Sequence, residues 1–392
     1  MRFIPSVISL ILPFTLSAYG GKKYDFSPTK SYAKVNFAKK APVIDGVISS
    51  GEYAGSYENY GLLKHNSSFL ASRQGRVFAA LDNEYLYFAV QTELPDAESG
   101  VRLKAKYKRR DSKIFHDDSL EIMFVPPEGK GVYHLIVNPA NKTFDYFYPI
   151  INGAVTVSKQ INWTPDLKIK SGFADRKYWT IEIRIPLKDI NVNKLSSVSK
   201  WKIQFARTWR NTTLQTALNR AYDFKRTTEM NDIVFAESTP GIRFSTLGDN
   251  YLQGKNHIRF TVDNPTNQPQ KIRYSISVIS EAAPRDKNGF ITVAPGSSQD
   301  IELKFTENSR LNYDLKAIFY DSKDEMIYQR SFFWQMPPER RWIAPETSNS
   351  TSLEIGVYPY YNKVRLRFGN HGVPFDMRNT ASAFAYPTDA NG

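Results

Sequence analysis

Apolar and polar residues alternate with a period of two in short runs along most of the chain, and this pattern is the strongest constraint on its fold. Successive side chains of a strand point to opposite faces, so each run predicts a half-buried β-strand. In the first half of the chain the runs cover residues 77–90, 120–125, 133–137, 143–148, 179–185 and 202–207. Turn-forming residues separate the runs, and no segment sustains a helical period. We therefore predict an all-β chain built from antiparallel β-sandwiches.

A second group of runs predicts a second sandwich. It covers residues 256–262, 272–279, 289–293, 300–305, 313–320 and 325–334. Short strands at this spacing are typical of an immunoglobulin-like domain, which we place at residues 245–335 with a boundary near residues 238–241. A length of 392 residues is sufficient for two such cores. Residues 336–392 are read as a linker and the start of a further domain, with strands at 353–358 and 363–368.

The N-terminus has the pattern of a signal peptide over residues 1–20. A short apolar stretch follows Arg2 and ends in small residues, and it is too short for a membrane-spanning helix. No later segment is apolar enough to span a membrane, and the chain has no cysteine. We expect a secreted, periplasmic or cell-surface bacterial protein that is stabilised by its sheet cores and not by disulfides.

The chain carries a formal net charge of +13. Its basic residues are spread out, with one cluster from Lys104 to Arg110 between strand-like segments. No basic helix and no RNA-binding aromatic signature accompanies the charge, so nucleic acid is not the expected partner. Exported basic proteins meet acidic glycans or envelopes instead.

A series of ordered blocks carries the most specific signal between Lys34 and Ala236. The blocks are APVIDG at 41–46 with Glu52-Tyr53, LDNEYLYFAV at 81–90, FHDDSLEIMF at 115–124, HLIVNP at 134–139, WTIEIRIPL at 179–187 and WKIQFAR at 201–207. In this order they resemble the family 9 carbohydrate-binding modules, relatives of the DOMON-type sandwiches. The resemblance covers residues 34–238 and implies a β-sandwich of jelly-roll or DOMON type that carries a sugar site.

The resemblance also implies site residues. The family has a clamp aromatic three positions before a motif aspartate and a hydroxyl-binding glutamate three positions after it. These match Phe115, Asp118 and Glu121, while Tyr222 or Phe224 takes the place of the second clamp aromatic. The chain departs from the family because it lacks both clamp tryptophans and has Ile136 where the family has a basic residue. Replacement stacking surfaces are expected from Trp163 and Trp209, which lie beside polar turn residues.

Each of these residues also has a structural interpretation. Phe115 would then be a core residue, Glu121 a solvated or ion-paired carboxylate, and Asp118 a ligand of loop amides. Trp179 and Trp201 begin strong strands and are expected in the core.

Catalysis is not expected. Asp117, Asp118 and Glu121 lie on one strand edge and do not form the opposed carboxylate pair of a glycoside hydrolase. There is no nucleophile-elbow motif, and the five histidines lack zinc-ligand spacing. Haem binding through Met123 and His134 is a further alternative, because some DOMON relatives hold haem between strand residues. No cofactor is expected, and the sequence does not decide whether a structural calcium is bound.

The sequence therefore predicts a secreted, non-catalytic protein that binds oligo- or polysaccharide by aromatic stacking and by hydrogen bonds to hydroxyls. Two alternatives stay open: a structural spacer or adhesin with a degenerate sugar site, and the N-terminal region of a glycoside hydrolase. The sequence determines neither the sugar nor the oligomeric state.

Overall fold

The computed structural model describes residues 30–71, 73–94, 103–175, 177–210, 214–246, 254–280, 284–307, 312–335, 342–343, 351–358, 363–370 and 381–385. The predicted signal peptide lies outside these residues. The described residues form β-strands and three short 3-10 helices: η1 (Ile114–His116), η2 (Val157–Lys159) and η3 (Leu187–Ile190). The predicted all-β fold is therefore confirmed. Within the described residues, no helix has the length and apolar character needed to cross a membrane.

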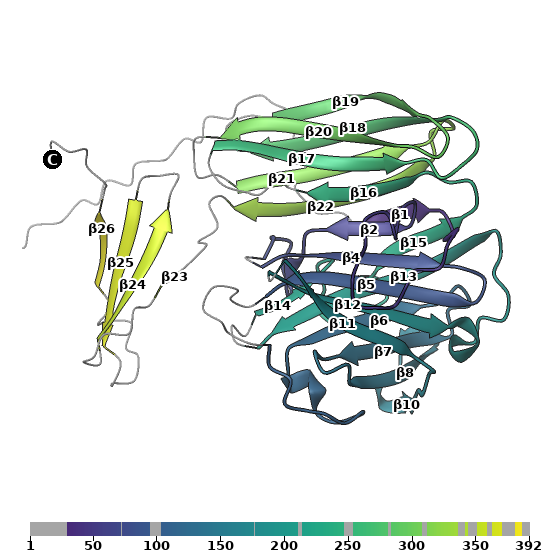
Figure 1. The fold of residues 1–392 in the computed structure, drawn as a ribbon, viewed down its shortest axis with the longest axis horizontal. Helices are drawn as coiled ribbons and strands as arrows, with labels where there is room; N and C mark the ends of the chain where they lie inside the picture. The colour runs from purple at the N-terminus through teal and green to yellow at the C-terminus, as the bar shows by residue number, and fades with distance from the viewer. Residues whose placement is uncertain are drawn as a thin grey trace, which may run out of the picture.

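Two facing sheets form the first sandwich (Figure 1). The larger contains β1 (Tyr32–Val35), β3 (Leu63–Lys64), β6 (Ser119–Val125), β7 (Gly131–Val137), β8 (Thr143–Ile151), β9 (Ala154–Val155), β10 (Ile161–Asn162), β13 (Val198–Trp209), β14 (Leu214–Ala217) and β15 (Asn231–Ala236). The smaller contains β2 (Tyr57–Tyr60), β4 (Gly75–Leu81), β5 (Tyr85–Glu93), β11 (Lys168–Ala174) and β12 (Tyr178–Pro186).

Aromatic rings from both sheets meet in the core between them. The Phe88 ring of the smaller sheet lies 5.5 Å from the Phe124 ring and 5.6 Å from the Phe205 ring of the larger sheet. Trp179 and Trp201 are buried there as predicted, at 2% and 1% exposure. Truncating a buried aromatic of this kind to alanine costs about 3–5 kcal/mol, so these contacts hold the two layers together.

Strand β6 divides its side chains between the core and the opposite face of the larger sheet. Leu120, Ile122 and Phe124 belong to the core between the sheets. The alternate residue Glu121 projects to the other face, where Met123 packs in a separate apolar cluster. This outward face of β6, β7 and β8 carries the candidate site.

The second sandwich has seven strands, β16 (Gly241–Thr246), β17 (Gly254–Asp263), β18 (Gln270–Ser280), β19 (Pro284–Val293), β20 (Ser298–Glu307), β21 (Asn312–Tyr320) and β22 (Met326–Gln335). Three of them, β16, β17 and β20, form one sheet that packs on the sheet of β18, β19, β21 and β22. It begins at Gly241, before the expected residue 245, because Ile242 and Phe244 alternate into its core.

Strand β1 joins the two sandwiches into one continuous sheet. It pairs in parallel with β15 and antiparallel with β22, so the larger sheet of the first sandwich runs on into the four-stranded sheet of the second (Figure 1). The apolar core is also continuous across both sandwiches. The sequence presents two separate units, whereas the structure shows them sharing a sheet and a core.

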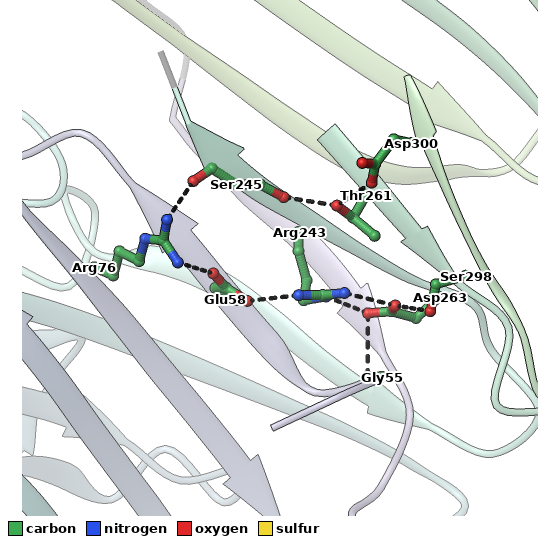
Figure 2. A network of polar contacts seen from close by, with 9 residues as sticks. All are labelled: Gly55, Glu58, Arg76, Arg243, Ser245, Thr261, Asp263, Ser298 and Asp300. Atoms are coloured by element: carbon green, nitrogen blue, oxygen red, sulfur yellow. Dashed lines mark hydrogen bonds and ion pairs between the residues drawn. The ribbon is translucent and has the colours of Figure 1, made fainter. Parts of the chain in front are cut away.

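A polar network crosses the junction of the sandwiches, which we call the seam (Figure 2). Glu58 on β2 lies 3.2 Å from the Arg243 guanidinium on β16 and 3.6 Å from Arg76 on β4. Arg243 also pairs with Asp263 of β17 through two of its nitrogens. Burial alone would lower the pKa of Arg243, but Asp263 and Glu58 hold it above its usual value. The network therefore links strands of both sandwiches through paired charges.

A second buried arginine lies deeper in the seam. Arg330 on β22 is fully buried and donates to the Leu218 carbonyl at 2.8 Å, to Asn219 Oδ1 at 3.2 Å and to the Gly61 carbonyl. These acceptors belong to loops of the first sandwich. One side chain of the second sandwich therefore satisfies backbone groups that the first leaves unpaired.

A separate four-stranded sheet contains β23 (Trp342–Ile343), β24 (Thr351–Tyr358), β25 (Lys363–Asn370) and β26 (Ala381–Ala385). The strands expected at 353–358 and 363–368 fall within β24 and β25.

Candidate functional site

A row of aromatic rings follows the outward face of β8 and continues onto η1 and the loop before it. We call this row the aromatic strip; in order it comprises Tyr107, His116, Phe115, Phe144, Tyr146 and Tyr148. Successive ring centroids are 6.4, 4.6, 5.5, 4.5 and 6.4 Å apart. His116 is exposed, Tyr148 is buried, and the other four rings are partly exposed. The strip is a nearly continuous aromatic surface that reaches solvent.

The strip forms because β8 places every second residue on one face. Phe144, Tyr146 and Tyr148 share the outward face, while Asp145 between them is buried and bonded to Arg110 at 2.5 Å. The short helix η1 then carries Phe115 to the Phe144 ring, which it meets edge to face. Three chain segments thus build one surface.

Glu121 and His134 form a polar pair beside the rings. Glu121 Oε2 lies 3.2 Å from His134 Nε2, and the two side chains are 14% and 9% exposed. His134 is the cross-strand partner of Tyr146, so the pair lies next to the middle of the strip. The other ring nitrogen of His134, Nδ1, is buried without a hydrogen-bond partner in the described part of the chain. The pair therefore places a partly exposed carboxylate and an imidazole ring beside the aromatic surface, while Nδ1 itself is enclosed.

The loop at residues 218–230 borders the opposite end of the strip. Phe224 packs on the apolar cluster that contains Met123 and Tyr148, and its ring meets His65 at 4.9 Å. Tyr222 is 65% exposed. The Lys225 ammonium lies 5.9 Å from the Tyr148 ring centroid and 3.2 Å from Asp223 Oδ1. Burial would raise the pKa of Asp223, but the backbone N–H and the charge of Lys225 hold it below its usual value.

Asp118 and its neighbour Asp117 are buried and used for structure. Asp118 accepts from the Lys104 amide at 2.7 Å, the Arg207 guanidinium at 3.0 Å and the Arg210 amide at 3.3 Å. Asp117 accepts from the Lys106 and Tyr107 amides, both at 2.9 Å. Asp118 therefore fits its structural interpretation, because its carboxylate is fully buried and bonded within the protein. Burial lowers the pKa of Arg207 to about 10, although Asp118 opposes this.

Trp163 and Trp209 do not provide the expected replacement stacking surfaces. Trp163 is 7% exposed in the core and meets Tyr133 at 4.9 Å, while its Nε1 donates to the Asp189 carbonyl at 2.8 Å. Trp209 is fully buried, and the Arg207 guanidinium lies 4.8 Å from its ring. Asn162 and Thr208, the polar residues before them, lie on strands β10 and β13, and the indoles themselves are buried.

The structure thus brings Phe115, Glu121 and Phe224 to one face and leaves Tyr222 at its exposed margin. The sequence interpretation missed Phe144, Tyr146 and Tyr148, and it considered His134 only as a haem ligand. A usable signal was present, because aromatics at every second position of the predicted strand 143–148 must share a face.

The haem interpretation does not fit this face. Met123 and His134 are direct cross-strand partners on the same side of the sheet. Their side chains lie side by side, so they cannot occupy the two opposite axial positions of one iron. Among the residues described by the structure, no group of three or more His, Cys, Asp or Glu side chains is arranged to hold a metal ion.

No protein-family model matches the chain, and no curated protein matches it by sequence. Among solved structures, the chain is similar to a Bacteroides uniformis protein to which carbohydrate binding is provisionally ascribed. That likeness has a TM-score of 0.42 and 11% identity, and it covers 53% of this chain and 100% of that one.

Two further structures are similar at lower scores. The first is beta-glucuronidase 2 of Bacteroides uniformis, with a TM-score of 0.20 and 7% identity over 75% of this chain and 33% of that one. The second is a red sea bream transglutaminase, with a TM-score of 0.18 and 9% identity over 70% of this chain and 31% of that one. At such scores the likenesses carry no information about the site, whose interpretation rests on its own geometry.

Proposed function

We propose that this protein binds carbohydrate chains, without catalysis, on the aromatic strip of the first sandwich. The observation that carries the proposal is the row of partly exposed rings beside the Glu121–His134 pair. Aromatic faces stack on the apolar C–H faces of sugar rings, and carboxylate and imidazole groups exchange hydrogen bonds with the hydroxyls at the sugar edge. Both kinds of group occur here on one surface.

The surrounding contacts support binding by a preformed site. Asp117 and Asp118 fix the backbone next to Phe115, and Arg210 donates to the Phe115 carbonyl. Strand pairing fixes Phe144 and Tyr146 on β8. Rings that are already ordered lose little conformational entropy when a ligand binds, which favours affinity.

Binding alone is proposed because the nearby carboxylates have other partners. Glycoside hydrolysis requires two carboxyl groups on opposite sides of the scissile bond. Asp117 and Asp118 are bonded to loop amides, Asp145 to Arg110, and Asp223 to Lys225. Glu121 is the carboxylate left beside the middle of the strip, and it is bonded to His134.

The wider assignment is also a proposal. The ordered blocks support kinship with family 9 carbohydrate-binding modules, and the apolar residues near the N-terminus support export. The second sandwich has seven strands in two sheets, which supports its interpretation as an immunoglobulin-like domain. N-terminal sequencing of protein recovered outside the cytoplasm tests the export proposal.

The binding proposal is tested with a protein of residues 21–392, first on a glycan array and then by calorimetric titration. Tyr146→Ala should weaken binding at least about fivefold, because removal of a stacking ring costs on the order of 1 kcal/mol. Phe173→Ala is the matched control, since Phe173 is 65% exposed on β11 of the other sheet. Glycan binding that both variants retain at full strength would refute the site, and no binding to any glycan would refute the function.

A further inference from the structure

We infer that the glycan bound by the strip is an acidic polysaccharide, a chain that bears carboxylate or sulfate groups. This inference rests on the proposed function, since it names the ligand class of the same surface. Its basis is a set of five basic side chains at one end of the strip, four of which form no ion pair with a described residue.

The basic residues follow one another in the loop before η1. They are Lys104, Lys106, Lys108, Arg109 and Arg110, which we call the basic loop, and all five are exposed. Residues 103–108 alternate between partly exposed and exposed, so Lys104, Lys106 and Lys108 are exposed while Leu103, Ala105 and Tyr107 are partly exposed. The Lys106 ammonium lies 5.8 Å from the centroid of Tyr107, the first ring of the strip.

The nearby acidic side chains neutralise one of these five cations. Asp145 and Asp111 both lie near Arg110, at 2.5 and 3.8 Å. Asp117 and Asp118 lie beside the loop, but their oxygens accept from backbone amides, from Asn138 and from Arg207. The remaining four cations pair with no acidic side chain in the described ranges. Among the described residues, the positive charge of these four side chains is therefore not neutralised.

The basic loop is held in place against the strip. The Lys104, Lys106 and Tyr107 amides donate to Asp117 or Asp118, and the Asp118 amide donates back to the Lys104 carbonyl at 3.0 Å. These contacts attach the loop to the two residues that follow Phe115 and His116 in the chain. The cations consequently start from a fixed backbone, so less ordering entropy opposes their contact with an anionic ligand.

The other groups on this face favour an acidic glycan over a nucleic acid. A single-stranded nucleic acid also stacks on aromatics in a basic groove. However, Glu121 lies beside the middle rings and Asp223 beside Tyr148, where closely spaced phosphates would meet carboxylates. A polysaccharide presents hydroxyls to these carboxylates and anionic groups to the basic loop, which matches the distribution of charge along the strip.

Two matched ligand pairs test the inference: polygalacturonate against its methyl ester, and dextran sulfate against dextran. The full residue 21–392 protein should bind the charged member of at least one pair about tenfold more tightly at about 50 mM NaCl, because several exposed charges act together. The difference should largely disappear near 0.5 M NaCl, since screening shortens the range of charge interactions. Which pair shows the difference identifies carboxylate or sulfate as the recognised group.

Two triple variants with equal charge change locate the effect. Lys104→Gln, Lys106→Gln and Lys108→Gln together should remove most of the preference for the charged chain. Lys168→Gln, Lys170→Gln and Lys194→Gln together should keep it, because these exposed lysines lie on β11 and after η3, away from the strip. Tyr146→Ala should weaken binding to the charged chain as well, which separates stacking from non-specific charge attraction.

Three results would overturn the inference in distinguishable ways. Equal binding of charged and neutral chains, weakened by Tyr146→Ala, would refute the acidic ligand and leave the proposed function intact. Charged-chain binding that Tyr146→Ala does not affect would refute both and indicate non-specific attraction. Tighter binding of an oligo(dT) strand than of either charged polysaccharide would assign the surface to nucleic acid.

Discussion

The seam and the aromatic strip both combine charged side chains with aromatic rings, yet they use these residues in opposite ways. In the seam, Arg330 is fully buried beside the Phe332 ring and donates to acceptors of the first sandwich. In the strip, most rings are partly exposed, and the lysines of the basic loop beside Tyr107 have no acidic partner in the described part of the chain. The comparison shows that residue type alone does not distinguish a structural cluster from a binding surface.

The physical difference is the cost of removing each charge from water. A buried cation without partners is strongly destabilising, so a fold retains one only when protein acceptors satisfy it. An exposed lysine keeps its hydration and contributes little to stability. Charges in the seam therefore act on folding, whereas charges at the strip remain free to act on a ligand. The following predictions test this distinction in order of decreasing effect.

The largest expected effect is the loss of Arg330. Arg330→Met removes the donors to Leu218, Asn219 and Gly61 and leaves buried acceptors unsatisfied, so it should destabilise the protein by about 3–5 kcal/mol. Urea denaturation measures this. The control is Arg273→Met on β18, whose partner Asp324 is largely exposed; it should cost less than about 1 kcal/mol. If the two variants lose the same stability, the buried Arg330 contributes no more to folding than the exposed Arg273 does.

The second effect concerns a residue first predicted at the sugar site. Asp118→Asn should destabilise the protein by about 3 kcal/mol, because it leaves the buried Arg207 guanidinium without a carboxylate. Glu121→Gln, three residues later and partly exposed, should change stability by less than about 1 kcal/mol. Thermal melting of both variants decides the matter, and a reversed order would place Asp118 in the site and Glu121 in the scaffold.

The third effect is a pH dependence at Glu182, a buried carboxylate that forms no ion pair with any residue that the structure describes. Its oxygens accept from the Gly46 amide at 2.8 Å and the Tyr53 hydroxyl at 3.2 Å. Burial raises its pKa to about 7, so the unfolded chain releases this proton first as pH rises. The stability contribution of the protonated side chain is complete below about pH 4.5 and is lost as pH rises through 7.

Glu182→Gln should flatten that dependence. Relative to the variant, the native protein should lose melting temperature between about pH 4.5 and pH 7 and change little above it. If the melting temperatures of the native protein and of Glu182→Gln change in parallel across this pH range, Glu182 is ionised in both the folded and the unfolded chain.

The fourth effect, at Phe115, is larger on binding than on stability. The ring is partly exposed and contacts Phe144 and His116, so Phe115→Ala should weaken glycan binding severalfold and cost about 1 kcal/mol of stability. A stability loss of about 3–5 kcal/mol would instead identify Phe115 as a core residue. Titration and melting of the same preparation separate the two outcomes.

The smallest effect is expected at Tyr222. It is 65% exposed at the margin of the strip, with Arg226 over its ring at 5.3 Å. Tyr222→Ala should leave stability within about 0.5 kcal/mol and reduce glycan affinity less than Tyr146→Ala does. A larger loss than at Tyr146 would move the centre of the site toward the 218–230 loop.

The sequence by itself determined the strands and hence the all-β fold, because the period-two alternation is a local property of the backbone. It also placed Trp179 and Trp201 in the core and brought Phe115, Glu121 and Phe224 into consideration for one site. It interpreted Asp118 correctly as a ligand of loop amides when that alternative was weighed, since aspartate in a loop commonly accepts from nearby amides.

Only the tertiary structure decided the seam and the strip. The seam depends on β1, which pairs with β15 and β22, strands about 200 and 300 positions away, and local pattern does not specify such partners. The strip depends on Tyr107, Phe115 and Tyr146 meeting from three segments of the chain. Trp163 and Trp209 turned inward for the same reason: whether an aromatic beside a turn faces solvent or core is fixed by the packing of distant strands and not by its sequence neighbours.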